Sequence, residues 1–120
     1  MIEHEIQAFG RRLGMESLAL NHDGMAQLDI EGIGSFFLER QEKGGQRHFL
    51  VYLSAPVQDY DVEAYRRLLA HCDYRRAYPL PLSSGVFSGK AVLLTYLDEH
   101  TATAADIENA FRFLAEIMYE

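Results

Sequence analysis

A chain of 120 residues, 48% hydrophobic and 24% charged, has the composition of one globular domain that can fold without a metal or a disulfide. Its formal net charge of -7 argues against nucleic acid as a partner. No apolar run is long enough to span a membrane, the N-terminus does not resemble a signal peptide, and Cys72 is the single cysteine. We therefore expect a single domain over residues 1–120, neither secreted nor membrane-spanning.

A short amphipathic helix is predicted over residues 2–13. Polar and charged side chains occupy most of its surface, and Gly14 follows as the C-terminal stop. Its apolar side chains recur at helical spacing: Ile2, Ile6, Phe9 and Leu13.

Several strands are predicted to follow this helix. Turn chemistry at residues 21–24 and the two glycines of the Gly32-Ile-Gly34 step separate runs with strand patterns. The candidate strands are residues 18–20, 25–31, 35–40 and 47–54. Up to four antiparallel strands in series would form a meander.

The second half of the chain is predicted to contain two helices separated by a hairpin. Asp59 or Asp61 can cap a helix whose apolar stripe runs from Val62 to Cys72. Residues 86–97 fit a hairpin, and Thr103 with Asp106 can cap a final helix that ends near Met118. The order α, several β, α, two β, α predicts an α+β fold with a twisted antiparallel sheet and three helices, not a doubly wound parallel sheet.

The predicted strands carry more apolar side chains than one buried face requires. In residues 47–54 and 91–97 both faces of the strand are apolar, and residues 36–38 are consecutive large hydrophobics. An uncovered apolar surface of this kind marks a site where other polypeptides bind. The alternative is that three helices and the loops cover both faces within one copy.

The sequence contains no constellation typical of an enzyme. His71 and Cys72 are adjacent, so on a helix their side chains diverge and cannot act as a base and nucleophile pair. No histidines are spaced as metal ligands, and the glycine pairs do not precede helices as phosphate-binding loops do. We expect no catalytic activity, no metal and no cofactor.

The apolar spacing resembles that of the class I type III secretion chaperones of Gram-negative bacteria, the Tir chaperone family. The resemblance extends over nearly the whole chain. It is carried by residues 9–13, 18–24, 25–30, 49–53, 68–70, 85–97 and the end of the final helix with Phe111, Phe113 and Leu114.

This resemblance implies a bacterial cytoplasmic homodimer that binds the N-terminal segment of a secreted effector and keeps it soluble and export-competent. The implied client-binding residues are Ile6, Phe9, Leu13, Leu28, Ile30, Phe36 and Leu38. The implied dimer interface consists of Tyr65, Leu68, Leu69, Cys72, Val86 and Phe87.

Two alternative functions remain open from the sequence. One is a protein of the same fold that binds a folded partner in regulation; the other is a small enzyme or ligand-binding domain with a pocket between sheet and helices. A small molecule should raise the melting temperature only in the last case. A pull-down that recovers a disordered N-terminal segment, rather than a folded domain, would favour the chaperone.

Overall fold

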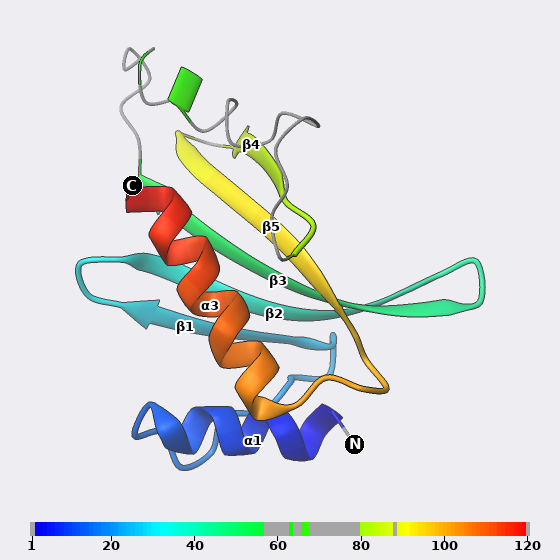
Figure 1. The fold of residues 1–120 in the computed structure, drawn as a ribbon. Helices are drawn as coiled ribbons and strands as arrows, with labels where there is room; N and C mark the ends of the chain where they lie inside the picture. Colours follow the sequence, from blue (N-terminus) through cyan, green and yellow to red (C-terminus); the bar gives the residue numbers. More distant parts are fainter. Residues whose placement is uncertain (1, 57–62, 64–65, 68–79, 88, 120) are drawn as a thin grey trace.

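The computed structural model describes residues 2–56, 63, 66–67, 80–87 and 89–119. The elements are α1 (Ile2–Arg12), β1 (Met25–Ile30), β2 (Gly34–Lys43), β3 (Gln46–Pro56), β4 (Ser83–Phe87), β5 (Lys90–Asp98) and α3 (Ala104–Tyr119). Figure 1 shows how the helices α1 and α3 are arranged around the sheet. Most of the predicted middle helix lies outside the described residues. Neither α1 nor α3 is long and apolar enough to cross a membrane.

All paired strands of the sheet are antiparallel, in the order β1-β2-β3-β5-β4, which confirms the predicted α+β class. The first three strands form the predicted meander, but residues 18–20 are not a strand. Instead, Asn21 closes a turn in which its side-chain Oδ1 accepts the backbone N–H groups of Asp23 and Met25. The turn chemistry was predicted correctly, and it starts β1 rather than joining two strands.

The ends of both helices follow from local sequence. Gly14, with a φ of 81°, ends α1 in a left-handed conformation, while the N–H of Met15 donates to the carbonyl of Gly10 at 2.8 Å. At the start of α3, Thr103 and Asp106 exchange side-chain to backbone hydrogen bonds, which is the predicted capping pair.

The hydrophobic core lies between one face of the sheet and the two helices. In Figure 1, α3 crosses this face and α1 lies at the β1 side of the molecule. Three aromatic rings join the layers: the centroid of Phe36 on β2 is 6.0 Å from that of Phe9 on α1 and 4.8 Å from that of Phe111 on α3. Burial of these rings fixes both helices against the sheet.

Gly34 begins β2 at a place where no side chain fits. Its φ is 141°, and a Cβ there would lie 2.4 Å from the backbone oxygen of Ser54. We expect Gly34→Ala to lower the free energy of unfolding by at least about 2 kcal/mol, because it adds a backbone clash to conformational strain. Urea denaturation measures this loss.

Gly32→Ala is the matched control. Gly32 also has a positive φ, of 79°, but a Cβ there meets nothing within 4 Å. Conformational strain alone predicts a cost of about 1 kcal/mol. Equal losses in the two variants would show that contact with Ser54 contributes nothing.

Candidate functional site

The sheet face opposite the helices is rich in apolar and aromatic side chains. Strand pairing aligns Phe37, Tyr52 and Leu94 in one row across β2, β3 and β5. The rings of Phe37 and Tyr52 are stacked with centroids 4.8 Å apart. We call this surface the open face; its large members are Phe37, Leu50, Tyr52, Val92, Leu94 and Tyr96. None of these six side chains is fully buried by the described residues.

Tyr52 combines this apolar surface with a polar contact. Its hydroxyl donates to the Glu39 carboxylate at 3.2 Å. Burial, together with the negative charge of Glu39, raises the pKa of Tyr52 to about 12. The phenol therefore remains protonated at physiological pH and holds Glu39 at the border of the open face.

The outer edge of β1 offers backbone groups that no described residue pairs with. The N–H of Arg40 donates to the carbonyl of Gly24, which sets the alternation of hydrogen bonds along β1 and β2. Every second residue counted from Gly24 directs its backbone groups toward β2. The residues between them, Gln27 and Asp29 among them, direct their N–H and C=O groups away from the sheet. The corresponding groups of Met25 are already hydrogen-bonded to Asn21, so the accessible edge is centred on Gln27 and Asp29.

The Asp29 carboxylate marks this edge. It accepts hydrogen bonds from Ser35 Oγ at 2.8 Å and from Gln27 Nε2 at 3.0 Å. These bonds, that of Ser35 foremost, lower the pKa of Asp29 below its usual value. The Asp29 carboxylate therefore carries a negative charge that is held toward β2, and the outward backbone groups of Asp29 stay accessible.

Exposed apolar side chains follow α1. Leu13 is 41% exposed and Met15 is 37% exposed, on either side of the helix-ending Gly14. The chain then turns back across α1, where Leu18 packs so closely on Gly10 that a Cβ at position 10 would lie 2.6 Å from Leu18 Cβ. The glycine keeps this crossing tight and leaves Leu13 and Met15 on the surface.

Ion pairs attach the N-terminal part of α1 to the sheet. Arg40 on β2 binds both Glu3 on α1 and Glu99 after β5, and the Glu99 side chain is only 5% exposed. The hydrogen bond from Arg40 lowers the pKa of Glu3, and the same contact, as the largest cause, raises that of Arg40. The Arg40 guanidinium thereby joins three segments that are distant in sequence.

Two further contacts attach α1 to α3. Glu5 accepts the backbone N–H of Ala104 at 3.1 Å, and Arg12 pairs with Glu108 at 2.7 Å. The Arg12 hydrogen bond is the main reason that the pKa of Glu108 is lowered. The stabilisation that Glu108 contributes is present above its ordinary pKa and is lost as the pH falls through the lowered pKa. Acid therefore weakens the attachment of α1.

The structure places most predicted client-binding side chains in the hydrophobic core. Five are buried, with at most 4% exposure: Ile6, Phe9, Leu28, Phe36 and Leu38. Ile30 is half-buried and Leu13 is exposed. Contact of the five buried side chains with a client would require them to leave the core, so Leu13 and Ile30 are the members that are accessible on the surface.

The predicted dimer residues are described only in part. Tyr65, Leu68, Leu69 and Cys72 lie outside the described residues. For Val86 and Phe87 the structure gives the backbone pairing of β4 with β5, where they are partners of Ala91 and Lys90. Because β4 is the other edge of the sheet, both residues lie on an edge strand, and their role in a dimer stays a prediction.

Sequence reasoning missed the ion pairs of Arg40 and the stack of Phe37 on Tyr52. The partners of Arg40 lie 37 and 59 positions away, and no local pattern signals such pairs. The stack could have been expected from the apolar runs once the strand register was known. Among the described residues, no group of histidine, cysteine and carboxylate side chains could hold a metal ion.

Comparison with known proteins decides the family. The family model for the type III secretory system chaperone SycN matches residues 1–120. The chain belongs to this family. That match confirms the predicted resemblance to type III secretion chaperones, whereas membership of the Tir group in particular stays a prediction. Proteins of this kind are non-enzymatic binding proteins, so this SycN-family chain is a chaperone and not an enzyme.

Solved structures share the fold of this SycN-family chain. Yersinia pestis SycH, in complex with a stable fragment of YscM2, is 14% identical with a TM-score of 0.72, over 99% of this chain and 98% of that chain. The HopA1–SchA chaperone–effector complex is 16% identical with a TM-score of 0.74, over 97% of this chain and 88% of that chain. The heterodimeric ExoU–SpcU complex of the Pseudomonas aeruginosa type III secretion system is 16% identical with a TM-score of 0.65, over 99% of this chain and 93% of that chain. No curated protein sequence matches the chain.

Proposed function

We propose that this SycN-family chaperone binds the N-terminal segment of a secreted effector in the bacterial cytoplasm, keeps the segment soluble and export-competent, and acts as a homodimer. The observation that carries the proposal is the β1 edge, which has no partner strand within the described part of the chain, on a molecule that also exposes Leu13 and Met15. Such a surface suits an extended client. The similar HopA1–SchA structure is itself a chaperone–effector complex.

In this proposal the client adds a strand beside β1. The client backbone would form hydrogen bonds with the outward N–H and C=O groups of Gln27 and Asp29. These bonds supply affinity that does not depend on the client's sequence. Alternate apolar side chains of the client would contact Leu13, Met15 and Ile30, which supply selectivity. The predicted client-binding residues that are buried would contribute indirectly, by holding α1 and the sheet in position: Ile6, Phe9, Leu28, Phe36 and Leu38.

Leu13→Asp is expected to weaken client binding by about tenfold or more, because a charge replaces an exposed apolar contact. The partner to test is the N-terminal segment of a secreted protein encoded beside this chain. Isothermal titration calorimetry measures the affinity, and hydrogen exchange on the complex should show new protection of the amides of Gln27 and Asp29.

Ala105→Asp on α3 is the matched control, since it adds the same charge at an exposed position outside the proposed surface. It should leave affinity unchanged, and both variants should melt near the unmodified protein. Equal binding by Leu13→Asp, or protection confined to a folded domain of the partner, would contradict the proposal.

The homodimer is proposed from the open face and the β4 edge. A second copy could bury the apolar side chains of β3 and β5 that neither described helix covers, and two copies would present two client surfaces to one effector. Leu69→Asp is expected to dissociate the dimer, because a twofold interface would bury the new charge twice. Sedimentation that shows an unchanged dimer would contradict this assignment.

A further inference from the structure

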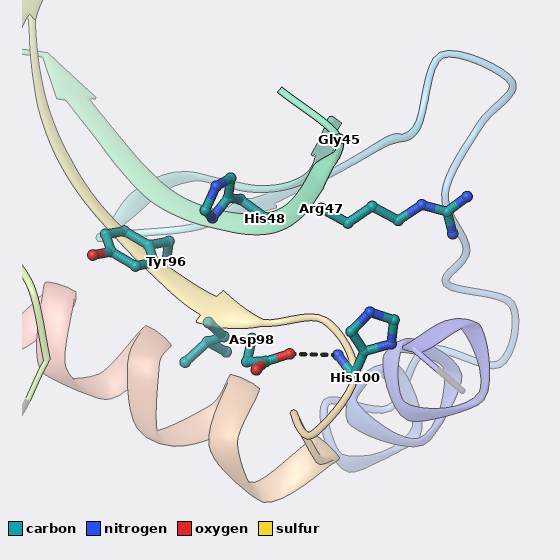
Figure 2. Close-up of a pocket in the computed structure, with 7 residues that line it drawn as sticks. Gly45, Arg47, His48, Tyr96, Asp98 and His100 are labelled. Atoms are coloured by element: carbon teal, nitrogen blue, oxygen red, sulfur yellow. Dashed lines mark hydrogen bonds between the residues drawn. The ribbon is translucent and has the colours of Figure 1, made fainter. Parts of the chain in front are cut away.

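A cavity of about 610 Å³ lies where the β2–β3 hairpin extends past the end of β5. His48 and Asp98 are the last partners that join β3 to β5, so Arg47 is paired with β2 but not with β5. Figure 2 shows His48 and Tyr96 on the sheet, Asp98 and His100 at the end of β5, and Arg47 reaching out from β3. The cavity is lined by Gly45, Arg47, His48, Tyr96, Leu97, Asp98 and His100.

Hydrogen-bond donors dominate the walls of this cavity. Arg47, His48 and His100 all carry N–H groups, and the exposed Tyr96 adds a hydroxyl. Asp98 is the single carboxylate among the described lining residues, and it already accepts the backbone N–H of His100 at 2.8 Å. The charged groups of the lining are therefore the Arg47 guanidinium and one carboxylate that is already hydrogen-bonded.

An ion pair positions Arg47 but leaves its N–H groups available for a further partner. Its Nη1 lies 3.7 Å from Oε2 of Glu99, beyond hydrogen-bond distance, while Arg40 binds the other oxygen of that carboxylate. The Arg47 side chain is 53% exposed. A guanidinium held in this way can offer two parallel N–H groups to an incoming carboxylate.

The available space favours a side chain on an extended chain over a small ion. A second cavity, of about 310 Å³, shares Arg47 and His100 with the first and reaches Ile2 on α1. Its remaining lining residues are Arg40 and the two carboxylates that Arg40 binds, those of Glu3 and Glu99. The two cavities exceed the volume that a lone carboxylate or phosphate fills. The stretch of β3 around Arg47 pairs with no described strand on the β5 side, and it adds an edge along which a short extended segment can lie.

We propose that this cavity binds a carboxylate side chain carried on an extended acidic segment of a partner protein. Arg47 binds the carboxylate through two guanidinium N–H groups, and His100 donates a further hydrogen bond. Tyr96 contacts the neighbouring residue of the segment. The site is distinct from the β1 edge, and its test requires neither the effector nor the dimer.

The test follows backbone amide signals of the isotope-labelled full chain during titration with four probes. These are a short capped peptide in which glutamate alternates with serine, the same peptide with glutamine in place of glutamate, sodium acetate and inorganic phosphate. The acidic peptide should shift the signals of Arg47, His48 and His100, with an affinity about tenfold above that of the glutamine peptide.

Variants assign the response to the cavity. Arg47→Gln and, independently, His100→Ala at an exposed position should reduce the response to the acidic peptide, whereas Arg112→Gln on α3 should not. Thermal unfolding checks that each variant is folded. Equal responses to both peptides, or a response that persists in Arg47→Gln and His100→Ala, would overturn the proposal. Acetate or phosphate that matches the acidic peptide would show a general anion site and overturn the peptide assignment.

Discussion

Phe36→Ala is expected to lower the free energy of unfolding by about 3–5 kcal/mol, a large part of the stability of a domain of this size. Phe36 is 0% exposed, and its ring contacts Phe9 of α1 and Phe111 of α3. Its removal would leave a cavity at the point where both helices meet the sheet. Urea denaturation followed by circular dichroism measures the loss.

Phe37→Ala is the matched control for this prediction. Phe37 is the next residue of β2 but lies on the open face, where it stacks on Tyr52 and is only partly buried. Its removal should cost about 1 kcal/mol of protomer stability. If Phe36→Ala instead kept full stability and lost client binding, Phe36 would belong to the client surface and not to the core.

Arg40→Gln is expected to cost about 2–3 kcal/mol, because it removes the partner of a nearly buried carboxylate. The Glu99 side chain is 5% exposed, and without Arg40 its nearest cation is Arg47 at 3.7 Å. A buried charge that loses its partner is strongly destabilising, while the partial exposure of Arg40 limits the effect. Equilibrium unfolding at neutral pH measures it, and hydrogen exchange should show faster opening of α1 because Glu3 also loses its partner.

A double variant separates the cost of the unpaired charge from the loss of the contact. Arg40→Gln with Glu99→Gln should recover about half of the lost stability, because no charge is then left buried. A double variant as unstable as Arg40→Gln alone would mean that the stability came from packing of the arginine side chain and not from its charge.

The predicted client-binding residues show what the apolar pattern of one sequence leaves undetermined. The helical spacing of Ile6 and Phe9 identified the apolar face of α1 correctly, and the alternation of Ala26, Leu28 and Ile30 identified one face of β1. Periodicity states which residues share a face but not whether that face meets the core or a partner. In the structure these faces pack inward, and the exposed apolar residues lie instead at Leu13 and Met15.

The sequence by itself determined the features that depend on neighbouring residues: the end of α1 at Gly14, the cap of α3 at Thr103 and Asp106, the meander and the final hairpin. Each rests on contacts within a few positions, which a linear pattern records. Tertiary structure alone decided which face of β2 and β3 became the core, because both faces are apolar and, within the described residues, the packing of α1 and α3 distinguishes them. It alone also brought Glu3, Arg40 and Glu99 together, since charges far apart in sequence pair only after the chain has folded.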